Sequence, residues 1–222
     1  MRVPADFSID YDLYWEARGR HGGKTGESPS EWQRERAGLA ARHIRKGSTV
    51  LDIGSGGGAV LEYLRDVCDI EPIGVDISEH SLQSLRAKNI EALNIDISLP
   101  GNATHLPEVD YIIGFEILEH MANPEHLVHI LSSKAREGMF FSFPNTGYYA
   151  HRLRLLLGRF PLQWAVHPGE HVRFWTVRDV LWWVPQIGLH LESLVVYQGL
   201  PFLKNLMPKL FGRGIFLYVR RT

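Results

Sequence analysis

The chain has 222 residues, 45% of them hydrophobic, and carries 24 basic against 25 acidic residues for a net charge of −1. This length and hydrophobic fraction predict a single domain with one sizeable core. The balanced charge lacks the strong nucleic-acid signature of a basic protein. The single cysteine, Cys68, allows no internal disulfide and favours a reducing compartment, so we expect a cytoplasmic protein. We find no signal peptide, and no apolar run is long enough to predict a transmembrane segment.

Short apolar strands alternate with segments of helical spacing along most of the chain, after an arm and a helix near 31–44. The predicted strands lie near 48–54, 72–76, 90–96, 109–115, 138–144, 189–197 and 214–221, and the predicted helices near 57–67, 78–89, 124–134 and 176–185. This α/β alternation predicts a doubly wound, mostly parallel seven-stranded sheet, with the last two strands antiparallel.

The alternation of predicted strands and helices is interrupted once, after the fifth strand. We therefore expect one domain over residues 1–222 with four parts. These are an N-terminal arm and helix (1–45), a cofactor-binding core (46–143), an insertion or lid (144–173), and a C-terminal helix with strands (174–222).

A glycine-rich turn, VLDIGSGGGAV at 50–60, joins the first strand of the alternation to a helix. Glycine permits positive φ and lets a ligand approach the backbone closely. The following helix presents free N–H groups. Asp76 ends the next strand, where a carboxylate can accept both ribose hydroxyls of a nucleoside. The combination predicts a nucleoside-binding edge of the sheet.

Two cofactor classes use such a turn. Gly54-x-Gly56-x-x-Ala59 fits the dinucleotide fingerprint, so a nicotinamide oxidoreductase is one alternative. S-adenosylmethionine (SAM) is favoured because Asp52, two residues before Gly54, suits the amino group of the methionine moiety and would repel a pyrophosphate. Asp96, at the end of the third predicted strand, suits the adenine amino group, with Ile97 stacking on the ring.

The segments VLDIGSGGG, IGVDIS, NIDIS and DYIIGFEILEH resemble the successive motifs of class I SAM-dependent methyltransferases over about residues 45–145. The resemblance implies a Rossmann-like fold, SAM as cofactor and S-adenosylhomocysteine as product. The cofactor-binding residues that it implies are Asp52, Gly54 and Gly56 at the methionine moiety, Asp76 at the ribose, Asp96 and Ile97 at the adenine, and Phe115 and Glu116 beside the sulfonium. Ser55, where many relatives have cysteine or another small residue, and Ile77 are also expected to bind the cofactor.

The C-terminal half also resembles a narrower family. FSFPNTGYYAHRLRLLLGRFP and MPKLFGRGIFLYVRR are similar to the methionine-biosynthesis MetW family, which pairs a methyltransferase-like domain with a role assisting a homoserine acyltransferase. GFEILEH and GEHVRFWT depart from that family's pattern. We therefore expect an enzyme that methylates a small-molecule acceptor at oxygen or nitrogen. A MetW-like non-catalytic or regulatory partner is the alternative, and the sequence leaves a protein partner or homo-oligomer open.

The segment GFEILEH, at 114–120, places candidate catalytic residues just past the fourth strand, on the ligand-binding edge. Glu119 and His120 lie there, and His171, which follows the insertion, could reach the same ligand-binding edge. His167 is a weaker candidate. A histidine there could take the proton of an acceptor hydroxyl.

The same residues allow a metal alternative. Glu116-x-x-Glu119-His120 with a later histidine is similar to the metal site of small-RNA 2′-O-methyltransferases, and ubiquinone-biosynthesis O-methyltransferases have a related ExxEH segment. Such a donor set would suit Mn²⁺ or Zn²⁺ better than Mg²⁺. Our main expectation is that the residues bind no metal, and a metal-dependent RNA 2′-O-methyltransferase is kept as a further alternative.

The insertion carries aromatic and arginine residues around the apolar segment LRLLLG. This composition favours a lid over the substrate. A basic amphipathic helix on a membrane or partner and a surface helix packed on the core are the alternatives. Trp175, Trp182 and Trp183, which fall at and within the predicted helix 176–185, are expected in the core or at an interface.

Overall fold

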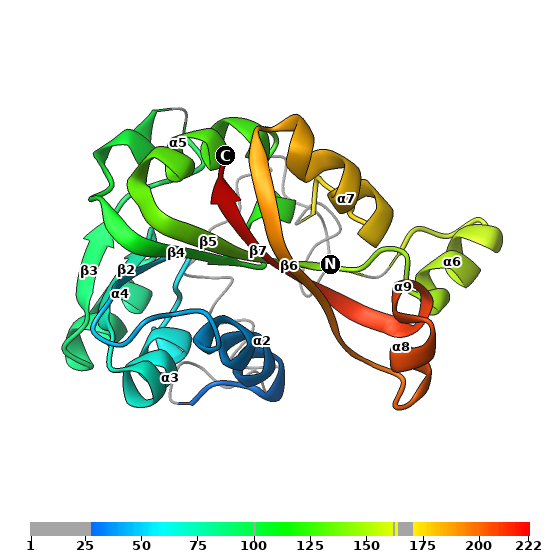
Figure 1. The fold of residues 1–222 in the computed structure, drawn as a ribbon, viewed down its shortest axis with the longest axis horizontal. Coiled ribbons are helices and arrows are strands. Elements are labelled where there is room, and N and C mark those ends of the chain that lie inside the picture. Colours follow the sequence, from blue (N-terminus) through cyan, green and yellow to red (C-terminus); the bar gives the residue numbers. More distant parts are fainter. Residues whose placement is uncertain (1–27, 100, 162, 164–170) are drawn as a thin grey trace, which may run out of the picture.

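The computed structural model describes residues 28–99, 101–161, 163 and 171–222. A seven-stranded sheet in the order β3-β2-β1-β4-β5-β7-β6 runs through the molecule (Figure 1). The strands are β1 (Thr49–Ile53), β2 (Glu71–Asp76), β3 (Glu91–Asn94), β4 (Val109–Phe115), β5 (Ala135–Pro144), β6 (Leu189–Gly199) and β7 (Gly212–Arg221). The first five pair in parallel, whereas β7 is antiparallel to both β5 and β6. The predicted fold class is confirmed.

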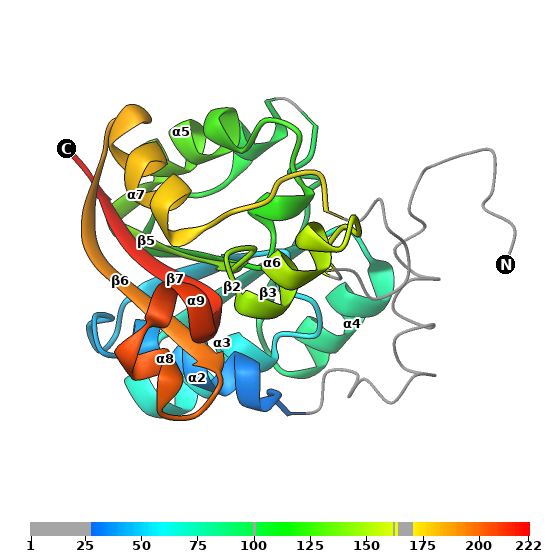
Figure 2. The same ribbon diagram turned by 90° about the vertical axis from the view of Figure 1, so that its right-hand side faces the viewer.

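Helices cover both faces of the sheet (Figures 1 and 2). One face carries α2 (Glu31–Ala41), α3 (Ala59–Cys68) and α4 (Glu79–Ala87), and the other carries α5 (Pro124–Lys134) and α7 (Val177–Gln186). Side chains alternate across the strands: Phe140 packs with the first group of helices, and Phe141 with the second. No helix within the described ranges has the length and apolar character needed to cross a bilayer.

Most element boundaries follow local chemistry that is visible in the sequence. Ser78 caps α4 as expected, because its side chain accepts a hydrogen bond from the Ser81 N–H. The third strand is shorter than predicted and ends at Asn94, not at Asp96. The Asp96 carboxylate accepts hydrogen bonds from the N–H and hydroxyl of Ser98, so the chain turns there and leaves the ladder.

A projection extends from one end of the sheet (Figures 1 and 2). It holds α6 (Tyr149–Leu156), which follows β5, and α8 (Leu203–Leu206) and α9 (Pro208–Phe211), which connect β6 to β7. The Tyr149 and Phe211 rings join the two segments, with centroids 5.6 Å apart. We call residues 149–161 and 200–211 the apolar tip. The sequence did not predict α8 and α9.

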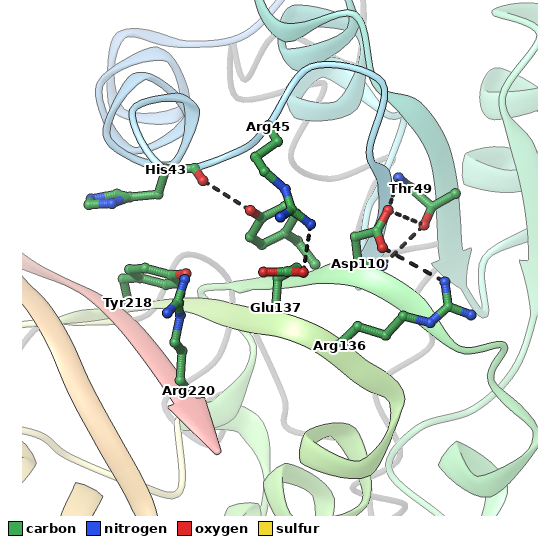
Figure 3. A network of polar contacts seen from close by, with 9 residues as sticks. His43, Arg45, Thr49, Asp110, Arg136, Glu137, Tyr218 and Arg220 are labelled. Carbon is green, nitrogen blue, oxygen red and sulfur yellow. Dashed lines mark hydrogen bonds and ion pairs between the residues drawn. The ribbon is translucent and has the colours of Figure 1, made fainter. Parts of the chain in front are cut away.

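The amino ends of the parallel strands are tied together by polar contacts (Figure 3). The Asp110 carboxylate on β4 accepts hydrogen bonds from the N–H and hydroxyl of Thr49 on β1, at 2.9 and 3.0 Å, and pairs with Arg136 on β5 at 3.7 Å. Arg45 binds Glu137 beside them. These contacts hold the edge of the sheet opposite to the glycine turn.

Part of the predicted organisation lies outside the described residues. This applies to residues 1–27, which hold most of the predicted arm, and to His167. The predicted boundaries of the four parts of the domain stay predictions.

Candidate active site

The glycine turn after β1 adopts the backbone that its sequence predicts. Gly54, Gly56 and Gly58 all have positive φ, of 67°, 53° and 76°. A Cβ added at Gly54 would lie 2.8 Å from the Ile117 Cδ1, so this position lacks room for a side chain as well as favouring glycine by conformation. The turn therefore lies directly beneath the segment that follows β4.

Asp76 ties the glycine turn to the end of β2. One carboxylate oxygen accepts the Gly56 N–H at 2.9 Å, and the other accepts the Ser78 N–H at 2.9 Å. The N–H groups of Gly54 and Ser55 donate to the Val75 carbonyl at 2.8 and 3.0 Å. Asp76 therefore stands at the predicted strand end with its orientation fixed by backbone donors. Its role at a ribose stays a prediction, as does that of Ile77, which is 37% exposed at the same edge.

The two residues predicted at the adenine lie beyond β3. Asp96 and Ile97 are both half-buried. The Asp96 side chain binds Ser98, and its carbonyl accepts a hydrogen bond from the Asn102 side chain at 3.0 Å. These bonds fix the loop at the same carboxyl edge as the glycine turn. The contact with adenine stays a prediction.

Asp52, on β1, is almost fully buried, with 4% of its surface exposed. Burial raises the pKa of its carboxyl to about 8, an effect that the Arg36 guanidinium opposes and the Asp76 carboxylate increases. Near neutral pH the carboxyl is therefore largely protonated. A cation placed beside it, such as the ammonium of a methionine moiety, would favour its ionised form.

Arg36, on α2, is a component of this site that sequence reasoning missed. Its guanidinium lies 5.3 Å from the centre of the Phe115 ring and pairs with Glu116 at 3.5 Å. Burial works to lower the pKa of Arg36, but the nearby Glu116 carboxylate outweighs it with other groups, and the net pKa is raised. Its Nε atom is buried without a hydrogen-bond partner in the described part of the chain. The sequence gives no signal that separates Arg36 from Arg34 in the same helix.

Glu116 turns away from the residues that follow it in the sequence. Its φ of 56° is unusual for a residue other than glycine. The carboxylate accepts hydrogen bonds from the Ser142 hydroxyl at 2.8 Å and the Tyr197 hydroxyl at 3.3 Å, in addition to the ion pair with Arg36. Phe115, one residue earlier, packs on Phe216 with its ring centroid 6.1 Å away. Both stand at the end of β4, and their contacts with a sulfonium stay predictions.

Glu119, His120 and His171 come together as a compact cluster. Each offers one ligand atom, and these atoms lie within 4.8 Å of one another. The two imidazole rings meet edge to face with centroids 4.7 Å apart. The N–H groups of Val172 and Arg173 donate to the Glu119 carbonyl at 2.9 and 3.1 Å, which positions the segment after the insertion against the short 3₁₀ helix Leu118–His120. The structure thus brings together all three predicted catalytic residues.

Glu119 is a buried residue, with 1% of its surface exposed. Neither oxygen of its carboxyl group has a hydrogen-bond partner among the described residues. Burial raises its pKa well above the usual range, and the Glu116 carboxylate adds to this effect. A cation beside this carboxyl would oppose both effects and favour its ionised form. Glu116 is not a member of the ligand cluster, so the four-residue metal site of the sequence alternative is reduced to one carboxylate and two imidazoles.

The tryptophans near the site divide between core and surface. Trp175 and Trp183 are buried and pack on each other with ring centroids 4.7 Å apart, as predicted for core residues. Trp182 is 67% exposed, so it does not belong to the core, and the predicted alternative of an interface position stays a prediction for this residue. It lies on the outer side of the amphipathic helix α7, one position before Trp183.

The sheet order, the glycine turn and the carboxylates at the ends of β1 and β2 define a class I SAM-dependent methyltransferase. The chain belongs to the methyltransferase-domain family, whose model matches residues 25–194. SAM is its cofactor, and the chain is an enzyme of this class.

Relatives and solved structures agree with this class. A ubiquinone biosynthesis O-methyltransferase of Azoarcus sp. (strain BH72) is 34% identical over 173 residues, which are 74% of this chain and 71% of the relative. A bifunctional methionine biosynthesis protein MetXA/MetW of Rhodopirellula baltica is 26% identical over 69% of this chain but 27% of its own length. The fold matches that of a SAM-dependent methyltransferase from Archaeoglobus fulgidus with a TM-score of 0.69 and 17% identity, over 96% of this chain and all of that one.

Proposed function

We propose that this enzyme transfers the methyl group of SAM to a hydroxyl oxygen of a small molecule. The paired histidines at the end of β4 carry the proposal, because His120 and His171 meet where an acceptor would face the donor. The similarity to ubiquinone biosynthesis O-methyltransferases supports oxygen over nitrogen as the methylated atom. The single cysteine supports a cytoplasmic location.

The cofactor is held by the edge that β1, β2 and β4 form. Asp52 faces the methionine ammonium, Asp76 accepts the ribose hydroxyls, and the glycine turn lets the backbone approach the ligand. Arg36 lies within reach of the same space and supplies a cation for the methionine carboxylate. This assignment is supported by its buried Nε atom, which has no partner within the described ranges.

Methyl transfer needs alignment of the acceptor oxygen with the methyl–sulfur bond. When bound, SAM would supply a methyl group on a positively charged sulfur, which would leave as a neutral thioether as the acceptor oxygen bonds to the methyl carbon. The hydroxyl proton passes to the imidazole of His120 or His171, and the buried Glu119 carboxyl borders this pair. General-base assistance of this kind contributes about 10²- to 10⁴-fold to rate.

Replacement of each histidine tests the proposal. We expect His120→Ala and His171→Ala to lower kcat by about a hundredfold or more while SAM affinity, measured by calorimetry, stays within about twofold. His126→Ala is the matched control, since this histidine is exposed on α5. The substrates are a panel of phenols, catechols and amines, with S-adenosylhomocysteine formation as the readout. Turnover of amines alone would contradict oxygen transfer, and unchanged kcat in both variants would contradict the proton role.

A divalent cation is a second candidate for the same three side chains. Two imidazoles and one carboxylate fit Zn²⁺ or Mn²⁺, and the partnerless Glu119 oxygens fit a cation as well. A bound ion would lower the pKa of an acceptor hydroxyl. Metal analysis of the purified protein, together with turnover in chelator, separates the candidates. Stoichiometric metal and chelator-sensitive turnover would favour the ion, and metal-free turnover would leave the histidines as the bases.

A MetW-like partner role is the alternative that the Rhodopirellula relative supports. It predicts co-purification with a homoserine acyltransferase and no methyl turnover on any acceptor in the panel. Turnover without any such partner would exclude it as the main role.

A further inference from the structure

The apolar tip exposes more large hydrophobic side chains than folding alone would leave in water. Leu156 on α6 is 82% exposed and Phe160 just after it is 71% exposed. On the neighbouring segment Phe202 is 79% exposed and Leu206 is 71% exposed. The two segments are in contact, because the Tyr149 and Phe211 rings lie with their centroids 5.6 Å apart. The helices α6, α8 and α9, which carry or border these residues, lie together on the projection at one end of the molecule (Figures 1 and 2).

The charges of the apolar tip are all of one sign. Residues 149–161 and 200–211 contain five arginine and lysine residues and no aspartate or glutamate; the cations are Arg152, Arg154, Arg159, Lys204 and Lys209. Lys204 pairs with Glu35 of α2 at 3.6 Å. The other four form no ion pair with an acidic residue that the structure describes. The surface is thus both apolar and cationic.

The backbone at Phe202 is strained in a way that presents its ring to solvent. Its φ of 66° and ψ of −53° form a γ-turn, closed by a hydrogen bond of 2.7 Å from the Leu203 N–H to the Pro201 carbonyl. This turn is rare and unfavourable for a residue with a side chain. A phenylalanine with an exposed ring at such a position gains nothing from the protein's own packing, which points to a contact outside the molecule.

We propose that the apolar tip docks on the surface of an anionic lipid membrane. Leucine and phenylalanine side chains would enter the boundary between head groups and acyl chains, and the four cations without acidic partners would contact anionic head groups. An anionic membrane offers both layers at once, head groups for the cations and acyl chains for the apolar side chains, whereas acidic residues on a partner protein would match the charges alone.

The tip is connected by the chain to the edge of the sheet that carries the site. The β5 strand, which ends at Pro144, leads directly into α6, and its carboxyl end belongs to the same edge as the glycine turn. If the proposed function holds, an amphiphilic acceptor held in the membrane surface would meet the cofactor at this edge. Membrane docking itself does not depend on methyl transfer.

Sedimentation of the full-length protein with lipid vesicles tests the proposal. The probes are vesicles of phosphatidylcholine alone and vesicles in which about a third of it is replaced by phosphatidylglycerol. We expect binding to the anionic vesicles, weakening as salt is raised, and much weaker binding to the neutral ones. SAM binding by calorimetry shows that every preparation is folded.

Substitutions locate the surface. Phe202→Gly removes the ring while suiting the positive φ, so it should keep or raise the thermal midpoint and weaken vesicle binding by about tenfold. Leu156→Ser should also weaken vesicle binding by about tenfold. Arg159→Glu and Lys209→Glu should each weaken it by fivefold or more, since one cation near an anionic leaflet is worth roughly fivefold. Val67→Ser, at an apolar residue 56% exposed on α3, and Arg178→Glu, on α7, are the matched controls and should bind as the parent does.

Three results would overturn the proposal. One is a SAM-binding parent protein that does not sediment with anionic vesicles. A second is equal binding by tip variants and parent. The third is a parent that self-associates through the tip, with the same variants restoring the monomer and no vesicle binding, since a second copy of the chain would then be the occupant.

Discussion

SAM affinity should depend on pH through Asp52. The carboxyl is buried in β1 and its pKa is raised to about 8 in the cofactor-free protein. The methionine ammonium interacts favourably with the ionised carboxylate alone. Binding therefore requires Asp52 to lose its proton, and the cost of that step falls as the pH rises.

The magnitude follows from the pKa. With a pKa of about 8, roughly 1% of the carboxyl is ionised at about pH 6, roughly 9% at about pH 7 and half at about pH 8. The dissociation constant for SAM should then fall about tenfold from pH 6 to pH 7, or ~1.4 kcal/mol, and about threefold from pH 7 to pH 8, where about half of the SAM amino group has also lost its proton. The tightening should level off there, because the SAM amino group itself deprotonates at a pKa of about 8.

The stability of the cofactor-free protein should change with pH in the opposite direction to its SAM affinity. Asp52 has a folded-state pKa above its unfolded value of about 3.9. Its contribution to stability is complete below the unfolded pKa and is lost as the pH rises toward about 8. The cofactor-free protein should therefore lose stability over this range, and the increase in thermal midpoint caused by SAM should grow.

Titration calorimetry in two buffers of different ionisation enthalpy measures the dissociation constant for SAM and the number of protons released on binding. We expect close to one proton to be released per SAM bound near neutral pH. Asp52→Asn should bind SAM more weakly at about pH 8 but with little pH dependence below it. Equal dissociation constants at about pH 6 and 7.5, with no buffer-dependent enthalpy in the parent, would refute the reasoning.

Three further predictions concern stability. Arg36→Met should lower the free energy of unfolding, measured in urea, by about 2–3 kcal/mol, because it leaves Glu116 without its counter-ion. The double variant Arg36→Met with Glu116→Gln should recover part of this loss, and an unchanged urea midpoint in Arg36→Met would contradict a stabilising pair. Gly54→Ala should cost about 1–3 kcal/mol, from its positive φ and its short contact, whereas Gly47→Ala, also at positive φ but with open space around its added Cβ, should cost less; equal losses would remove the steric argument. Asp110 has its pKa lowered mainly by a backbone hydrogen bond, so Asp110→Asn should cost about 1 kcal/mol near neutral pH and progressively less below about pH 4; a loss of stability that persists in acid would refute this.

The core of the fold could be predicted because local and long-range signals agree along it. The segment 109–115 is almost wholly apolar and became β4, buried on both faces. The helix predicted at 124–134 begins with a proline and is capped by the Asn123 side chain, which fixes the bounds of α5. Glycines between a strand and a helix left few alternatives to the turn at 54–58.

Much of the site could not be predicted because it depends on contacts between distant segments. Glu116 appeared to belong with Glu119 by spacing. A left-handed backbone instead turns it toward Arg36, which lies 80 positions earlier in the sequence, and toward Tyr197, which lies 81 positions later. The sequence predicted that His120 and His171 share one site, but their ring contact depends on two backbone hydrogen bonds to the Glu119 carbonyl, for which no side-chain pattern gives a signal. Short helices such as α8 lack the length to show a periodicity.

The position of β7 has a consequence for the order of assembly. β7 follows β6 in the chain yet lies between β5 and β6, and it is antiparallel to both. During synthesis β6 therefore leaves the ribosome before the strand that must join it to the sheet exists. Until β7 emerges, the edge of β5 is open and Tyr197 on β6 cannot be carried to Glu116 by sheet pairing. A nascent chain at this stage presents an unpaired apolar strand edge, the kind of surface that favours aggregation and chaperone binding.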